Sequence, residues 1–261
     1  MSLVVALGMG CGGGDDGDGG GGPPDGATLP VEPTAFRVTL MELRDPHAFA
    51  FNGAFDVTGT VNDQIGDAMT MDADDPPDGN LDLSIVVVHR PLDQSAGSIA
   101  GDVVFPDCTT PVLSTSCTLT AGAMVVQTTL TNAAATCLDA VPGTTSGFSP
   151  AVEPTQGPCF STEAETLDVS LGELVIPLID TQLAGRYVND PADGLDQGLI
   201  RGFLTQEAAD NATIPESVAI VGGDPVSSVL RDEDKDPGPG GEDGWWFYLN
   251  YDANLVPYTT Q

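Results

Sequence analysis

The chain has 261 residues, of which 39 are Asp or Glu and 7 are Lys or Arg, so its formal net charge is -32. So acidic a surface repels phosphate backbones, which excludes nucleic acid as a partner and leaves divalent cations and cationic surfaces as natural counterparts. The length suits a single all-β domain, and no apolar run approaches the roughly 18 residues that span a bilayer.

The N-terminus consists of an apolar run over residues 3–9, then Gly10 and Cys11, then a stretch rich in Gly, Asp and Pro. This order resembles the end of a bacterial lipoprotein signal peptide, in which the cysteine carries the lipid. The resemblance implies a signal peptide over 1–10, whose start would be truncated because no Lys or Arg precedes the apolar run. It also implies acylation of Cys11, palmitate included, and a lipid-anchored, disordered linker over 11–33.

The remainder, 34–261, is expected to form a single β-rich domain. Apolar and polar residues alternate over Phe36–Leu43, which predicts a strand, and a second extended stretch is expected over Ala48–Val61. The unbroken apolar run Ile85–Val88 predicts a strand that is covered on both faces and central in a sheet. His89, next to Arg90, is interpreted as part of a solvated or packed strand end rather than as a catalytic base.

Turn residues separate further expected strands at Ser98–Phe105, Thr118–Leu130, Thr166–Ile179, Gly185–Val188 and Gly198–Leu204. The segment 131–163 is expected to be irregular. A short helix is predicted near 205–211, with Thr205 as its cap. Together the elements predict an all-β fold, either an antiparallel β-sandwich or a jelly-roll-like arrangement.

Two acidic loops are candidate metal sites. The first resembles the D-x-D-x-D-G loop of calcium-binding repeats, which implies calcium ligands at Asp72, Asp74, Asp78, Asn80 and Asp82. Two extra residues break the usual spacing and a closing glutamate is missing, so the expected affinity is weak, roughly 0.1 to 1 mM. A polar hairpin loop without metal is the alternative.

The second acidic loop repeats the alternation less well. Its candidate ligands are Asp232, Asp234 and Asp236, but Pro237 stands where the turn glycine belongs. Calcium is therefore the one cofactor that the sequence suggests.

Removing Cys11 from the count of five leaves four cysteines, which allow three disulfide pairings. The sequential pairing, Cys108–Cys117 and Cys137–Cys159, is favoured because each bridge closes a short loop. Each would contribute about 3 kcal/mol by loop-closure entropy. A zinc site is disfavoured because there is no C-x-x-C and both histidines lie far away in the sequence.

The last strand, Trp245–Tyr251, alternates aromatic residues on both faces. One face must be core. Trp246 and Tyr248 on the other face could stack against sugar rings, or could be buried under loops, which is the favoured interpretation.

Familiar hydrolase motifs such as G-x-S-x-G and H-E-x-x-H are absent from the sequence, so an enzyme is not predicted. The favoured function is a structural or binding module of the cell envelope, lipid-anchored and nearer the outer membrane than the inner. A divalent cation, a glycan or an envelope protein are its candidate partners. The alternatives are a carbohydrate-binding module and a carboxylate-based hydrolase.

Four short phrases of the domain are similar to Gram-negative lipoproteins of unassigned role, so the resemblance brings no activity with it. They are Arg44–His47, Leu81–Ser84, Gly157–Phe160 and Gly244–Tyr248.

Overall fold

The computed structural model describes residues 32–51, 53–171, 174–216 and 221–261. The predicted signal peptide, the lipidation site Cys11 and the linker as far as residue 31 lie outside the described residues. Within the described part of the chain, no helix has the length and apolar character of a membrane span.

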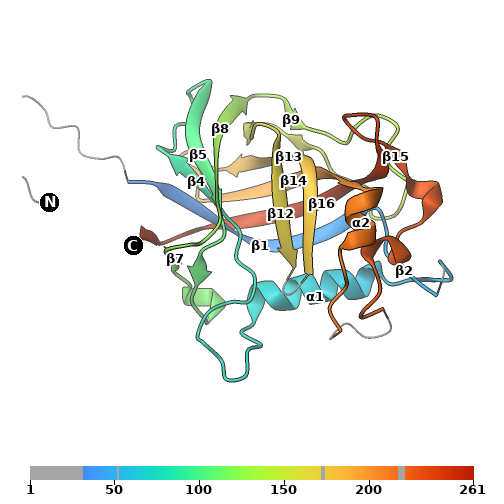
Figure 1. The fold of residues 1–261 in the computed structure, drawn as a ribbon. Coiled ribbons are helices and arrows are strands. Elements are labelled where there is room, and N and C mark those ends of the chain that lie inside the picture. Colours follow the sequence, from blue (N-terminus) through green and yellow to red (C-terminus); the bar gives the residue numbers. More distant parts are fainter. Residues whose placement is uncertain (1–31, 52, 172–173, 217–220) are drawn as a thin grey trace, which may run out of the picture. The chain divides into compact units, whose positions relative to one another are not determined.

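The main sheet closes on itself, because its last long strand pairs with its first (Figure 1). Neighbours along the closed circuit are antiparallel. The strands of the circuit, in order, are β1 (Thr34–Asp45), β4 (Val86–Arg90), β5 (Ser98–Val104), β8 (Val125–Ala133), β11 (Cys159–Ser161), β13 (Leu174–Val188), β14 (Gly194–Thr205) and β16 (Asp243–Val256). Closure leaves these strands with few unpaired edges and encloses one apolar interior.

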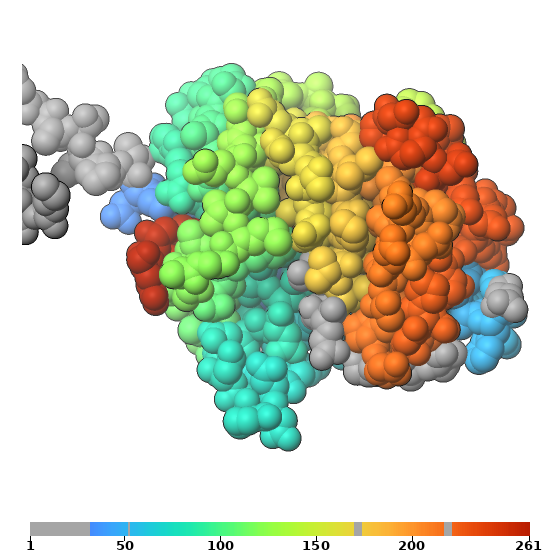
Figure 2. Space-filling view, in the orientation of Figure 1, coloured from blue at the N-terminus to red at the C-terminus, as the bar shows by residue number. Residues whose placement is uncertain are grey.

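Shorter elements cover the outside and one end of this closed sheet. The strands among them are β2 (Phe49–Ala50), β3 (Phe55–Asp56), β6 (Asp107–Cys108), β7 (Cys117–Leu119), β9 (Thr136–Leu138), β10 (Thr155–Gln156), β12 (Glu165–Leu171), β15 (Asp236–Pro237) and β17 (Tyr258–Thr260). The helices are α1 (Thr58–Thr70) and α2 (Gln206–Asn211), with short 3-10 turns at η1 (Val112–Ser114), η2 (Val226–Val229) and η3 (Asp232–Asp234). Figure 2 shows the hairpin of β12 and β13, in yellow, lying between green strands and the orange α2 segment.

The buried side chains form three clusters. The largest fills the interior of the closed sheet and includes Phe36, Phe160 and Leu249. The other two lie on the outside: one under the small sheet β6–β7–β17, and one under the segment that carries β9. The all-β prediction is confirmed, and the facing halves of the closed sheet pack in the manner of a sandwich.

Most of the predicted strands are confirmed. The single strand expected over Thr118–Leu130 is wrong, because β7 and β8 are separate strands of different sheets there, and the structure differs in two further regions. Val86, Val87 and Val88 are completely buried in β4, which lies between β1 and β5, as predicted. The single strand expected over Thr166–Ile179 is wrong, because β12 and β13 form a hairpin there. The stretch expected to be irregular, 131–163, contains β9, β10 and β11.

The two predicted disulfides, Cys108–Cys117 and Cys137–Cys159, are both present. The first joins directly opposite residues of β6 and β7. The second joins β9 to β11, and so attaches the covering segment to the closed sheet.

The extended stretch predicted over Ala48–Val61 is wrong, because β2 and β3 form a small hairpin and α1 follows. Two glycines and three threonines give α1 a poor intrinsic propensity, and Val57 offers no side-chain cap. Tertiary contacts therefore hold the helix: Ile65 and Met69 are buried in the interior cluster. The expected helix α2 is confirmed, with the hydroxyl of Thr205 accepting from the Ala208 amide.

Candidate functional site: an apolar cavity beneath the closed sheet

A cavity of about 620 Å³ lies where α1 and the α2–η2 segment cover the interior of the closed sheet. Its walls come from α1, the hairpin of β12 and β13, strands β1 and β16, and the segment 214–230 apart from its undescribed residues. Figure 1 shows α1 running beneath this hairpin and β1. The size falls within the range of roughly 300 to 1,000 Å³ that is usual for small-molecule pockets.

The first wall is one face of α1. Val61, Ile65 and Ala68 line the cavity, as does Val57 just before the helix, and their spacings of four, four and three residues place them on one helical stripe. This spacing of about 3.6 residues indicates a helix and could have been read from the sequence. The prediction of an extended stretch over Ala48–Val61 did not take it into account.

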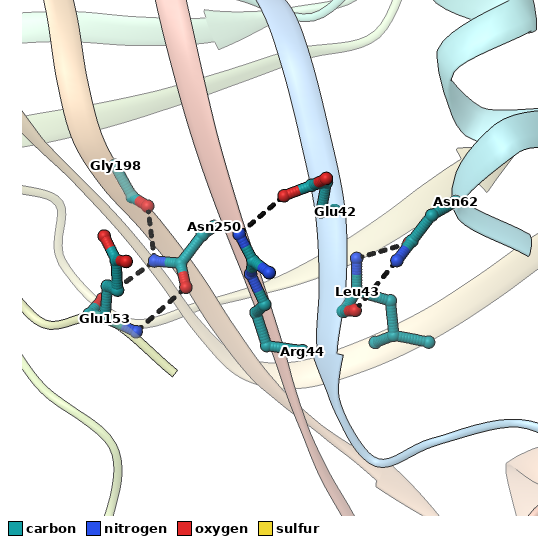
Figure 3. A network of polar contacts seen from close by, with 7 residues as sticks. All are labelled: Glu42, Leu43, Arg44, Asn62, Glu153, Gly198 and Asn250. Carbon is teal, nitrogen blue, oxygen red and sulfur yellow. Dashed lines mark hydrogen bonds and ion pairs between the residues drawn. The ribbon is translucent and has the colours of Figure 1, made fainter. Parts of the chain in front are cut away.

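Hydrogen bonds from the Asn62 side chain fix α1 against strand β1. The Leu43 amide donates to Asn62 Oδ1 at 2.7 Å, and Asn62 Nδ2 donates to the Leu43 carbonyl at 3.2 Å (Figure 3). The Asn62 side chain therefore bonds with both the backbone amide and the backbone carbonyl of Leu43, as a neighbouring strand would. At the other end of α1, the buried guanidinium of Arg37 donates to the Met69 carbonyl. Both contacts hold the helical wall in place across the cavity.

The second wall is the inner face of the sheet. Phe247 and Leu249 of β16 line the cavity next to Leu43 of β1 and Ile176 and Leu178 of β13. These positions alternate with side chains that point outward, as the period of two in a strand requires. The wall is apolar, and β16 is held in its centre by pairing with both β1 and β14.

The third wall is the connection that follows α2. Ile214, Val226 and Val229 are buried and line the cavity. Backbone hydrogen bonds from Val226 to Ala212 at 2.9 Å and from Ile214 to Asp224 at 2.9 Å fold this connection back on itself.

The polar residues of the lining are acidic or neutral. Gln64, Asp67, Asp74 and Asp82 are its polar members, and no Lys, Arg or His lines the cavity in the part of the chain that the structure describes. All four are exposed, so they lie where the lining meets solvent. The cavity thus combines an aliphatic interior with a negatively charged rim.

Three residues of the first acidic loop converge beside this rim. One ligand atom from each of Asp72, Asp74 and Asp82 lies within 4.8 Å of the others. Partial desolvation, and then repulsion from Asp78, Asp82 and Asp72, raise the pKa of Asp74. Asp78, also predicted as a ligand, does not belong to this triad.

Backbone amides hold the triad in its arrangement. The Gly79 amide donates to Asp72 Oδ2 at 2.7 Å, and the Ala73 amide donates to Asp82 Oδ1 at 3.1 Å. Gly79 has a φ of 89°, which explains why the turn needs glycine. Asp78 instead accepts from the Asn80 amide at 2.8 Å, so it stabilises the turn.

The second acidic loop does not form the predicted site. In the described part of the chain, Asp232, Asp234 and Asp236 do not bring three ligand atoms within that distance. Asp232 and Asp234 are the two end residues of the 3-10 turn η3, and Asp236 begins strand β15. Lys235 Nζ lies 2.5 Å from Asp232 Oδ1.

The proposed stacking platform for sugars is also wrong, because Trp246 and Tyr248 are 4% and 0% exposed. Trp246 packs edge to face against Phe203 at 5.3 Å between ring centroids. The Tyr248 hydroxyl accepts from the Val141 amide at 3.1 Å and bonds with the Thr144 hydroxyl. Burial of both under the covering segment is the interpretation that the sequence favoured.

Asn250, two residues after Tyr248 on the same face of β16, also bonds with the covering segment. Its side chain exchanges two hydrogen bonds with the backbone of Glu153, at 2.9 and 2.8 Å, and donates to the Gly198 carbonyl at 2.9 Å (Figure 3). The outer face of β16 is therefore filled and hydrogen-bonded.

Two titratable groups are buried away from the cavity. Burial lowers the pKa of His89 to about 3, and among the described residues neither ring nitrogen has a hydrogen-bond partner. Burial raises the pKa of Asp45 to about 6. A hydrogen bond from the Ser146 amide opposes this shift, and the negative charge of Asp234 adds to it. Titration of these two groups makes the stability of the fold depend on pH, and neither group lines the cavity.

No family model matches this chain, and neither a curated protein nor a solved structure matches it. The class is therefore defined by its own geometry: a closed antiparallel β domain, braced by disulfides, with an apolar cavity at one end.

Proposed function

We propose that this protein is a binding module that holds an apolar small molecule, or an acyl chain, in the cavity between α1 and the closed sheet. The observation that carries the proposal is the cavity of about 620 Å³ with aliphatic walls. A pocket that is mostly apolar and bounded by rigid elements is the usual form of a small-molecule site.

The size of the cavity also argues against a simple packing defect. Protein interiors rarely contain voids larger than a water molecule. This cavity is far larger than such a void and opens to solvent at its rim, so a bound apolar molecule would remove its aliphatic lining from water.

The test is binding of a neutral apolar fluorophore, N-phenyl-1-naphthylamine, to the full chain. We expect saturable fluorescence enhancement that Ala68→Phe weakens at least about tenfold, the equivalent of 1.4 kcal/mol, because the new ring occupies the cavity. Thr60→Phe is the matched control, since Thr60 is exposed on the same helix and does not line the cavity. Equal binding by both variants, with unchanged melting temperatures, would refute the proposal.

A weak calcium site at the first acidic loop is the second candidate. It is favoured by one observation, the convergence of Asp72, Asp74 and Asp82. Calcium prefers several carboxylate oxygens, and the short supply of ligands here agrees with weak binding. A thermal melt with and without millimolar calcium tests it, and a higher melting temperature with calcium is expected.

We also propose that the protein works in the cell envelope, attached through Cys11. The two disulfides support an oxidising compartment, where such bridges persist. Mass spectrometry of the mature N-terminus tests the attachment: a diacylglyceryl group on Cys11 is expected, and an unmodified residue at that position would refute it.

A further inference from the structure

We infer that the molecule held in this cavity is a cationic amphiphile, with an aliphatic body and an amine or other positively charged head group. This inference rests on the proposed function and names the ligand class for the same site. It joins two features of the lining, its apolar walls and the sign of its rim.

The body of the ligand follows from the walls. Aliphatic side chains from three directions, such as Ile65, Ile176 and Val226, face the cavity, whereas its aromatic lining residue is Phe247. Such walls gain free energy by removing apolar surface from water and offer no hydrogen-bond partners to heavily hydroxylated molecules. An alkyl or terpenoid body suits them better than a sugar or a nucleotide.

The head group follows from the rim. Asp67 projects from the last turns of α1, and Asp74 and Asp82 come from the acidic loop that follows. No basic side chain lines the cavity in the described ranges, so these carboxylates act on a ligand without a compensating charge. An anionic head, such as a carboxylate or a phosphate, would be repelled by all three.

The carboxylates are also available to a ligand. Among the described residues, the side chains of Asp67 and Asp74 make no ion pair with a Lys, Arg or His. Asp74 lies close to the carboxylates of Asp72 and Asp82, with one oxygen of each within 4.8 Å of the others. A cation at this position would relieve the repulsion between these carboxylates, whereas a neutral head would leave it in place.

The experiment compares three probes that share one alkyl chain: dodecylammonium, dodecanol and dodecanoate. Each displaces N-phenyl-1-naphthylamine from the full chain, below the concentration at which the probes form micelles. We expect dodecylammonium to bind about tenfold more tightly than dodecanol, and dodecanoate to bind most weakly. High salt should shrink the advantage of the cation, because exposed charges are screened.

Charge-neutral variants locate the effect. Asp67→Asn and Asp74→Asn should each reduce the affinity for dodecylammonium several-fold and leave that for dodecanol unchanged. Asp63→Asn is the matched control, since Asp63 is exposed one turn before Asp67 on α1 and does not line the cavity. It removes the same charge from the same helix, so it should change neither affinity.

The outcomes separate the two proposals. If dodecanol displaces the fluorophore as well as dodecylammonium does, the cationic head is refuted and the apolar cavity site stands. If Asp63→Asn weakens the cation as much as Asp67→Asn, the effect comes from net charge and the inference is also refuted. If the fluorophore itself fails to bind, the proposed function is refuted, and this inference with it.

Discussion

Neighbouring residues of strand β16 point to its two faces, and the two faces have different surroundings. On the outer face, Trp246 and Tyr248 are buried under the segment that contains β9, and their polar atoms are hydrogen-bonded. On the inner face, Phe247 and Leu249 are also largely buried, yet they line the cavity of about 620 Å³.

The difference shows that burial alone does not distinguish a core from a site. The outer face has close aromatic contacts, a tyrosine hydroxyl with two partners and a disulfide that attaches its cover. The inner face has aliphatic side chains and a cover, α1, of low intrinsic helix propensity that depends on contacts such as those of Asn62. The first arrangement stabilises the domain, and the second leaves space for a ligand.

The largest expected effect contrasts the two faces directly. Trp246→Ala should lower the free energy of unfolding by roughly 3 to 5 kcal/mol, because a packed aromatic side chain leaves a new cavity. Leu249→Ala should cost nearer 2 kcal/mol, since one side of that side chain faces the cavity rather than packed neighbours. Chemical denaturation measures both, and equal losses would contradict the contrast between the faces.

The next effect concerns the bridge that attaches the outer cover. Replacing both Cys137 and Cys159 by alanine should lower the free energy of unfolding by about 3 kcal/mol, in keeping with the loop that the bridge closes. Binding of the fluorophore should persist, because this bridge is remote from the cavity lining. Denaturation and fluorescence titration check the two parts, and lost binding in a folded variant would contradict the separation of the faces.

The sequence predicted the elements whose local pattern agrees with their final place. Val86–Val88 had a continuous apolar run and became a central strand, and short cysteine spacings gave both disulfides. The cavity was not predicted because α1 has a weak local signal, and because its lining joins residues from β1 to β16 that meet only in the closed sheet. Asp232, Asp234 and Asp236 had the spacing of ligands, but spacing did not reveal the pairing of Asp232 with Lys235.

A third prediction concerns acid stability. His89 is packed against Phe36, Phe160 and Tyr187, and its pKa of about 3 lies below the ordinary 6.5. The stability due to neutral His89 is therefore present above pH 6.5 and is lost as the pH falls, by about 1.4 kcal/mol per unit. His89→Phe should remove this loss, as denaturation from pH 7 to pH 4 would show.

Titration of Asp45 changes the stability with pH in the opposite direction to that of His89, so Asp45 serves as the control. Its pKa of about 6 lies above the ordinary 3.8, so its contribution is complete below pH 3.8 and is lost as the pH rises through 6. In the His89→Phe variant, stability should therefore rise as the pH falls from 6 to 4. Adding Asp45→Asn should flatten the curve, and a persistent acid loss in the His89→Phe variant would contradict the assignment.

The smallest expected effect is that of calcium. If the triad of Asp72, Asp74 and Asp82 binds calcium, a tenfold excess over the dissociation constant stabilises the domain by about 1.4 kcal/mol. A melt with and without millimolar calcium measures this shift, with magnesium and Asp82→Asn as controls. No shift, or an equal shift in Asp82→Asn, would remove the metal site.

The central claim is that the inner face of β16 borders a ligand site and the outer face does not. Methyl NMR of the full chain, with isoleucine and leucine methyl groups labelled, tests it during titration with dodecanol. The account predicts saturable shifts at Ile65, Ile176 and Leu249, while Leu138 and Leu199 of the outer cluster stay unchanged. Shifts of the same size on both faces, or none at the inner methyl groups, would contradict it.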